Sequence, residues 1–151
     1  VCLCDAGDTP GLPAGTRTDQ LIMESRKEQA ADRKRSGKYN CAQAVAMTYA
    51  DIAGLDEDVI LAVTASFGTG MGTMEGTCGA LVGAGVVTGA VIKDRMRSRA
   101  AMKKILTAFR ERNGATVCRD LKGIGTGCPL RDCNDCVADA AEVLERELGL
   151  V

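Results

Sequence analysis

The sequence of 151 residues contains no histidine. Histidine is the commonest general base at neutral pH and a frequent metal ligand. Its absence excludes Cys/His nucleophilic pairs, Cys2His2 zinc sites and haem attachment through a C-x-x-C-H motif. It also argues against a Rieske-type cluster, which needs two histidine ligands.

Aromatic residues, long apolar runs and an excess of one charge are also missing. The chain has two Phe, two Tyr and no Trp, so its core must consist mainly of smaller aliphatic side chains. The longest nearly apolar run, residues 80–92, is shorter than the roughly 20 residues that a membrane span requires. Lys and Arg (19) nearly balance Asp and Glu (20) and are interleaved with them. We therefore expect neither membrane nor nucleic-acid binding. No secretory signal pattern opens the sequence, and we expect a cytoplasmic protein.

Cysteine, in contrast, is abundant, with eight residues. A domain of this length does not need a disulfide scaffold, so this number indicates metal or redox chemistry. Three of the eight lie in "CPLRDCNDC", residues 128–136. Their C-x4-C-x2-C spacing is that of three ligands in a plant-type ferredoxin. No cysteine follows Cys136, so any further ligand must come from upstream.

The apolar pattern predicts an all-α fold, a compact multi-helix bundle. Residues 1–19 hold two of the three prolines and no apolar periodicity, which predicts an irregular N-terminal arm before a single domain at 20–151. A glycine-rich loop is expected at 68–79, followed by a glycine-rich helix at the centre of the bundle. Other helices are predicted at 20–36, 40–54, from 56, 94–112, 117–122 and from about 134.

Most of the cysteines fall at predicted helix starts. Cys41 follows the potential cap Asn40, Cys78 follows Thr77, and Cys118 lies in the first turn of its helix. Cys133 and Cys136 flank the start of the last helix. The free N–H groups and positive dipole end of a helix N-terminus favour a thiolate. Convergence of these N-termini would form an electropositive pocket suited to a metal, to an anionic iron–sulfur core, or to a reactive dithiol.

Five segments in order resemble the C_GCAxxG_C_C family, whose members are described as redox-active: "YNCAQAV", "FGTGMG", "GTCGALVGA", "VCRDL" and "CVADAAEVLE". The resemblance implies a redox or metal site at Cys41, Cys78 and Cys118. Cys133 and Cys136 both stand close to the position of the fourth family cysteine, and we favour Cys133. A related module in split-Soret cytochromes implies a [2Fe–2S] cluster.

The remaining features near this site have less definite roles. The family pattern does not call for Cys2, Cys4 or Cys128. We regard Cys136 and Cys128 as alternate ligands or resolving thiols, and we assign Gly76, Gly79 and Gly83 to the site loop.

Three functions are compatible with these cysteines. The first is electron transfer or redox sensing through an iron–sulfur cluster held by Cys41, Cys78, Cys118 and either Cys133 or Cys136. The second is thiol–disulfide exchange without a metal, for which Cys133-x-x-Cys136 at a helix start has a suitable local layout. The third is a structural Cys4 zinc site. The first two imply a redox partner protein whose identity the sequence does not give. A homodimer through the glycine-lined helix is a further expectation.

Overall fold

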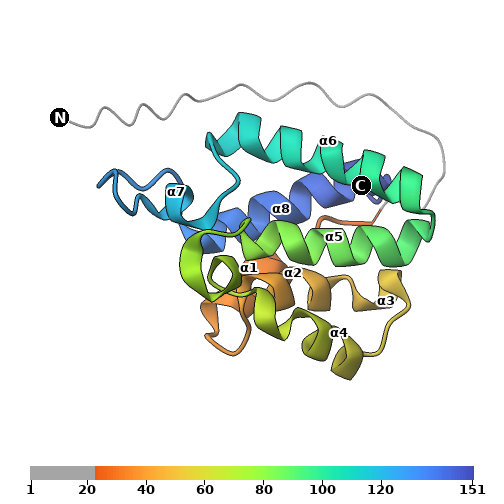
Figure 1. The fold of residues 1–151 in the computed structure, drawn as a ribbon. Coiled ribbons are helices and arrows are strands. Elements are labelled where there is room, and N and C mark those ends of the chain that lie inside the picture. The colour runs from red at the N-terminus through yellow and green to blue at the C-terminus, as the bar shows by residue number, and fades with distance from the viewer. Residues whose placement is uncertain (1–22) are drawn as a thin grey trace.

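The computed structural model describes residues 23–151 as a bundle of helices (Figure 1). The α-helices are α1 (Lys27–Arg35), α2 (Cys41–Thr48), α3 (Ala50–Ala53), α4 (Glu57–Thr64), α5 (Gly79–Ile92), α6 (Arg95–Asn113), α7 (Cys118–Lys122) and α8 (Cys133–Leu148). Between α4 and α5 lie a 3-10 turn, η1 (Ala65–Phe67), and a π-helical turn, η2 (Gly70–Met74). The expected arm at 1–19, with Cys2 and Cys4, lies outside the described residues.

The predicted all-α class is confirmed for this part of the chain. No β-strand occurs in residues 23–151, and extended backbone pairs only in an isolated bridge between Thr77 and Val117. Helix α5 packs against α2, α3, α6 and α8, and α8 also packs against α1 and α2 (Figure 1). Small aliphatic side chains, many of them alanines, fill most of the buried interior. Within the described residues, every helix is too short or too polar to cross a bilayer.

Glycines at the start of α5 permit its close contact with α2. A Cβ atom on Gly83 would meet the backbone of Ala42, with the Ala42 Cα only 3.0 Å away. A Cβ atom on Gly79 would lie 2.7 Å from the Phe67 carbonyl oxygen and 3.2 Å from the Cys41 Cβ. These two glycines therefore set the separation between the two helices at the end where Cys41 and Cys78 lie.

This packing predicts opposite effects for two glycine substitutions in α5. Gly83→Ala should lower the free energy of unfolding by about 1–3 kcal/mol, because backbone atoms of α2 cannot yield to the new methyl group. Gly89→Ala should raise it by about 0.5–1 kcal/mol, because nothing lies within 4 Å of its Cβ position and alanine favours the helix. Urea unfolding of the metal-free protein measures both. Equal effects at the two positions would contradict the close contact.

Most helix boundaries follow the predicted pattern. Asn40 and Gln43 form the expected capping box at the start of α2, and Asp94 caps α6. The predicted helix at 40–54 is interrupted at Tyr49, whose φ of −113° and ψ of 21° separate α2 from α3. The expected cap Thr77 is wrong, because Cys78 itself occupies the N-cap position of α5. Helix α8 begins at Cys133, one residue before the predicted start, with Asp132 as its cap.

The largest boundary error concerns α1, which begins at Lys27 although the sequence predicts a helix from residue 20. The side chain of its N-cap residue, Arg26, makes no capping hydrogen bond. Instead, the fully buried Glu145 of α8 accepts hydrogen bonds from the Arg26 N–H (2.6 Å), the Ser25 hydroxyl (2.6 Å) and the buried Tyr49 hydroxyl (2.7 Å). A carboxylate remote in sequence therefore satisfies the first turn of α1, which no local pattern could indicate.

Candidate functional site

Five cysteine side chains line one cavity at the end of the bundle where several helices begin. They are Cys41, Cys78, Cys118, Cys133 and Cys136. All five are thiols and not disulfides. The cavity measures about 60 Å³, several times the space that one water molecule needs. Cys128 is half-buried and does not line this cavity.

The thiols come from four helix starts that are far apart in the sequence. Cys41, Cys118 and Cys133 are the first residues of α2, α7 and α8, and Cys78 is the N-cap of α5. Cys136 lies one turn further into α8 and is only 2% exposed. The structure thus brings together the four cysteines of the favoured set and adds Cys136.

The bridge between Thr77 and Val117 places the side chains of Cys78 and Cys118 on the same face of the paired backbone segments. The Cys78 N–H donates to the Thr116 carbonyl (2.7 Å), and the Cys118 N–H donates to the Gly76 carbonyl (3.0 Å). Side chains alternate between the two faces of extended backbone, so Cys78 and Cys118 share the face opposite to Thr77 and Val117. This short pairing therefore directs both thiols toward the cavity.

The glycine-rich loop before α5 passes directly over Cys118. A Cβ on Gly70 would lie 2.6 Å from the Cys118 Cβ, and both residues line the cavity. The loop contains three non-glycine residues with positive φ, namely Thr69, Met71 and Met74. Such conformations are disfavoured for residues with a side chain, and they concentrate at functional sites.

Three cationic side chains also reach the cavity wall: Lys34 from the last turn of α1, Lys122 at the end of α7, and Arg131 before α8. Among residues 23–151, no carboxylate side chain lines the cavity. Together with the helix N-termini, these cations make the site favourable for negative charge.

One pair of thiols is formed by Cys41 and Cys133. Hydrogen bonding from Cys41 is the main influence that lowers the pKa of Cys133 to about 6, and Lys122 and Lys34 lower it further. The same hydrogen bond, together with burial, raises the pKa of Cys41 above its ordinary range. Cys41 is therefore the protonated donor and Cys133 the thiolate of this pair.

Besides its contact with the Arg131 carbonyl oxygen at 4.0 Å, Cys136 forms a second thiol–thiol hydrogen bond, with Cys78. This bond lowers the pKa of Cys78, which the backbone N–H groups of Ala80 and Leu81 lower further, against the opposing effect of burial. The hydrogen bond and burial raise the pKa of Cys136. Burial is also the main cause that raises the pKa of Cys118, while Lys122 opposes it. The surroundings therefore favour the thiolate form at Cys133 and Cys78 and disfavour it at Cys41, Cys118 and Cys136.

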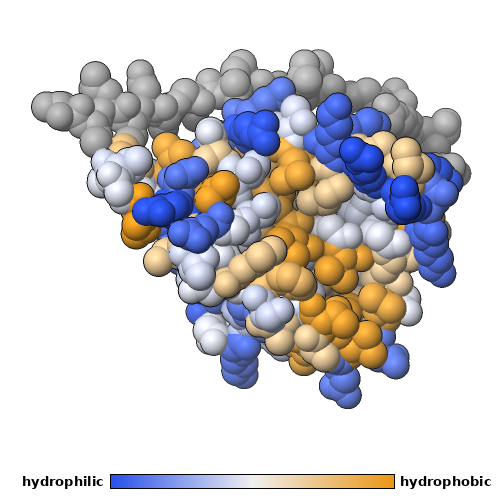
Figure 2. All heavy atoms as spheres, in the orientation of Figure 1, coloured by the Kyte–Doolittle hydropathy of each residue, from blue (hydrophilic) through white to orange (hydrophobic). Residues whose placement is uncertain are grey.

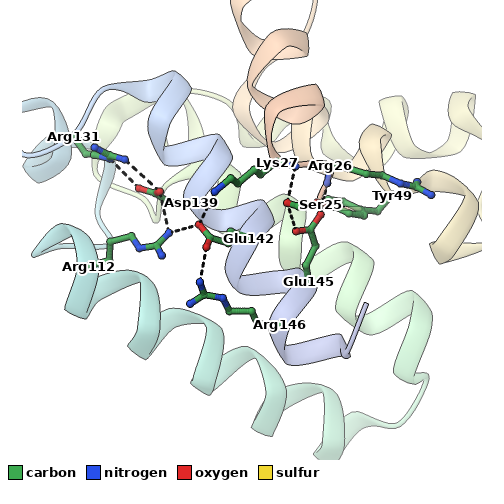
Figure 3. A network of polar contacts seen from close by, with 10 residues as sticks. All are labelled: Ser25, Arg26, Lys27, Tyr49, Arg112, Arg131, Asp139, Glu142, Glu145 and Arg146. Carbon is green, nitrogen blue, oxygen red and sulfur yellow. Dashed lines mark hydrogen bonds and ion pairs between the residues drawn. The ribbon is translucent and has the colours of Figure 1, made fainter. Parts of the chain in front are cut away.

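A network of side-chain ion pairs along α8 holds Arg131 at the cavity (Figure 3). Its guanidinium contacts the buried Asp139 at 2.9 Å, and Asp139 also binds Arg112 of α6 at 3.1 Å. Arg112 continues to Glu142 at 2.8 Å, and its hydrogen bond is the main cause that lowers the pKa of that carboxyl. The position of Arg131 is thus fixed by α6 and α8 together.

A family model described as "Putative redox-active protein (C_GCAxxG_C_C)" matches residues 39–147. This match covers well over half of the chain. The chain belongs to the C_GCAxxG_C_C family. No curated protein and no solved structure matches it.

The matched span of the C_GCAxxG_C_C protein contains every cysteine of the cavity. Its redox-active description agrees with the class that the cysteine content predicts. Of the three site-loop glycines, Gly79 lines the cavity, while Gly76 and Gly83 lie beside it against Gly70 and α2.

Sequence reasoning missed the cations of the C_GCAxxG_C_C site. Lys34 belongs to the run "RKEQAADRKR", a pattern typical of a solvated helix face, yet its side chain lines the cavity. No pattern in the sequence indicated a role for Lys122 or Arg131 at the site. The only available signal was their proximity in sequence to Cys118 and Cys133, which does not determine where a flexible side chain points.

Proposed function

We propose that this C_GCAxxG_C_C protein binds an iron–sulfur cluster in the cysteine cavity and uses it for one-electron transfer or redox sensing. The observation that carries the proposal is the convergence of five thiols and three cations on one cavity. Clusters of the [2Fe–2S] and [4Fe–4S] types are held by four cysteine thiolates. Such a core with its thiolates is anionic, which explains the need for cations and helix N-termini around it.

The arrangement of the thiols favours a two-iron cluster. Among residues 23–151, no three Cys, Asp or Glu side chains are grouped as ligands of a single metal ion. The zinc alternative needs four ligands around one ion, and metal analysis of the purified protein tests it. A [2Fe–2S] cluster takes two cysteines per iron, and the site offers the hydrogen-bonded pair Cys41 and Cys133 and the pair Cys78 and Cys118 across the bridge.

We assign the fifth thiol, Cys136, as a hydrogen-bond donor to the Cys78 sulfur. Its raised pKa keeps it protonated, and its side chain is buried one turn into α8. When bound, the cluster supplies one-electron chemistry. The protein would hold it through four thiolates, balance its charge with Lys34, Lys122 and Arg131, and donate the Ala80 and Leu81 N–H groups and the Cys136 S–H to the Cys78 sulfur. Such hydrogen bonds adjust the reduction potential of iron–sulfur centres.

Anaerobic purification tests this proposal. The protein should be brown, absorb broadly in the visible range, and contain two iron and two acid-labile sulfide per chain, the [2Fe–2S] stoichiometry. Elemental analysis for zinc should find only traces. Colourless protein without iron or sulfide, even after reconstitution with ferrous iron and sulfide, would eliminate the cluster.

The hydrogen-bonded pair Cys41 and Cys133 supports a second candidate function, thiol–disulfide exchange. In this reaction the Cys133 thiolate attacks a substrate disulfide and Cys41 resolves the mixed disulfide. The two thiols lose two protons and two electrons to form one S–S bond, and the substrate disulfide becomes two thiols.

This pair predicts an acid shift in the pH dependence of alkylation. In reduced, metal-free protein, the rate of iodoacetamide reaction at Cys133 should rise with a midpoint near pH 6, because its thiolate forms at low pH. In urea the midpoint should move to about 8.5, the value of an unperturbed cysteine. Cys41→Ala should move the native midpoint upward, because it removes the hydrogen-bond donor to the Cys133 thiolate. Mass spectrometry of the Cys133 peptide gives the rates. Identical midpoints in native and unfolded protein would count against an activated thiolate.

A further inference from the structure

Helix α6 carries a concentrated positive charge. It contains seven Arg or Lys residues and a single Glu, although the whole chain has a net charge of −1. Lys104 and Arg112 pair with carboxylates of α8. The other five have no ion-pair partner within residues 23–151: Arg95, Arg97, Arg99, Lys103 and Arg110. Unneutralised side chains on one helix create a positive field that extends into solvent.

An apolar groove lies beside these cations, between α6, α5 and the loop that precedes α5. Its lining includes Phe67, Met71, Val82, Val86, Met102 and Leu106. The Met71 side chain is 53% exposed. Figure 2 shows apolar side chains gathered over α5 and α4, with hydrophilic ones along α6. Met102 and Leu106 also border a second hollow that Arg99, Lys103 and Arg110 line. The surface therefore has an apolar centre with a cationic edge.

The groove and the cysteine cavity are separated by a wall one residue thick. Thr77 lines the groove, and the next residue, Cys78, lines the cavity. Met71 lines the groove, and the preceding residue, Gly70, lines the cavity. A protein seated in the groove would therefore lie close to the redox site.

We infer that the groove and the cationic edge of α6 form the docking surface for an acidic electron-carrier protein. This inference rests on the proposed redox function. In the docked complex one electron passes between the carrier's redox centre and the cysteine site, so that one is oxidised as the other is reduced, without transfer of an atom.

Charge complementarity favours an acidic protein as the partner that binds this surface. A second copy of the chain, docked through the same face, would bring two cationic helices together, and such like-charge contacts are unfavourable. An acidic protein would neutralise the edge and cover the apolar centre. Electron-transfer complexes use small interfaces of this kind, and electrostatic attraction accelerates their formation.

Titration with carriers of opposite charge tests the docking surface. The probes are a plant-type ferredoxin, which is acidic, and cytochrome c, which is basic, each titrated calorimetrically into the full chain at about 20 mM and about 200 mM salt. We expect the ferredoxin to bind and the cytochrome not to bind, and we expect at least a tenfold loss of ferredoxin affinity at the higher salt concentration.

Charge reversal locates the surface. Arg99→Glu combined with Lys103→Glu should weaken ferredoxin binding at least tenfold. The control, Arg35→Glu combined with Lys38→Glu, makes the same change in net charge at exposed positions near the end of α1 and should leave affinity within twofold. Circular dichroism verifies that both variants fold.

Three outcomes would overturn the inference: equal loss of affinity in the two variants, no ferredoxin binding at low salt, or sedimentation that shows self-association through α6. Charge-sensitive binding only to vesicles of anionic phospholipid would overturn it as well. The titration does not require a cluster, so protein that stays free of iron and sulfide after reconstitution but still binds ferredoxin would refute the proposed cofactor and leave the docking surface intact.

Discussion

Cys78→Ser is expected to abolish cluster binding. Cys78 is the N-cap of α5, its pKa is lowered by the surrounding donors, and the bridge at Thr77 fixes its direction toward the cavity. A serine hydroxyl does not ionise at neutral pH and is a poor ligand for iron. We therefore expect iron and acid-labile sulfide to fall at least tenfold after anaerobic purification, with loss of the visible spectrum.

Variants of the other cysteines test whether loss of the cluster is specific to the four proposed ligands. Cys41→Ser, Cys118→Ser and Cys133→Ser should resemble Cys78→Ser, because each removes one of the four proposed ligands. Cys136→Ser should retain iron and sulfide but change the reduction potential, because it replaces the proposed S–H donor to Cys78. Cys128→Ser, at a position outside the cavity wall, should retain full occupancy.

The comparison of Cys118→Ser with Cys136→Ser distinguishes two ligand sets. Loss of the cluster in Cys136→Ser together with its retention in Cys118→Ser would show that the hydrogen-bonded pair Cys78 and Cys136 ligates the iron, and it would refute our assignment of the fourth ligand. Full occupancy in all five cavity variants would refute the cysteine site as a whole.

Glu145→Ala should cause a large loss of stability, although the residue lies away from the cysteines. It removes the acceptor shared by the Ser25 hydroxyl, the Arg26 N–H and the buried Tyr49 hydroxyl (Figure 3). Hydrogen bonds to a charged group contribute about 1.5–3 kcal/mol each, and buried donors left without an acceptor add a further cost. Because the bonds share one carboxylate and are not additive, we expect the free energy of unfolding to fall by about 3–4 kcal/mol.

Tyr49→Phe provides the matched control for this network. It removes one donor and leaves Glu145 bonded to Ser25 and Arg26, so the expected loss is about 1 kcal/mol. The double variant should lose less than the sum of the two single variants, because Glu145→Ala has already removed the bond that Tyr49→Phe deletes. Urea unfolding of metal-free protein measures all three. A loss below about 1 kcal/mol for Glu145→Ala would contradict its role as the cap of α1.

Several elements could be predicted because their signals are local. The Asn40 and Gln43 capping box specifies the start of α2, and Asp94 and Gly114 bound α6. Segments without such signals were misplaced. The start of α1 depends on Glu145, which lies 119 residues from Arg26, and the break at Tyr49 coincides with the burial of its ring and its bond to that carboxylate.

The ferredoxin-like spacing of Cys128, Cys133 and Cys136 shows that a local pattern also fails to identify which cysteines form the site. By spacing alone these residues form one motif, but only Cys133 and Cys136 line the cavity. Helix α8 presents Cys133 at its start and Cys136 one turn deeper toward the same cavity. Cys128 belongs to the preceding loop. Helical geometry, and not the spacing of the run, therefore decides which of the three reach the site.

The sequence by itself determined the all-α class, the redox chemistry expected of a histidine-free, cysteine-rich chain, and membership of the C_GCAxxG_C_C family. Those conclusions depend on composition, local periodicity and motifs, which are properties of neighbouring residues. Tertiary structure alone decided that thiols from four helix starts share one cavity with Lys34, Lys122 and Arg131. That convergence requires α5 to pack closely on α2 through Gly79 and Gly83, and the Thr77 bridge to turn Cys78 and Cys118 inward, which are contacts between segments far apart in the chain.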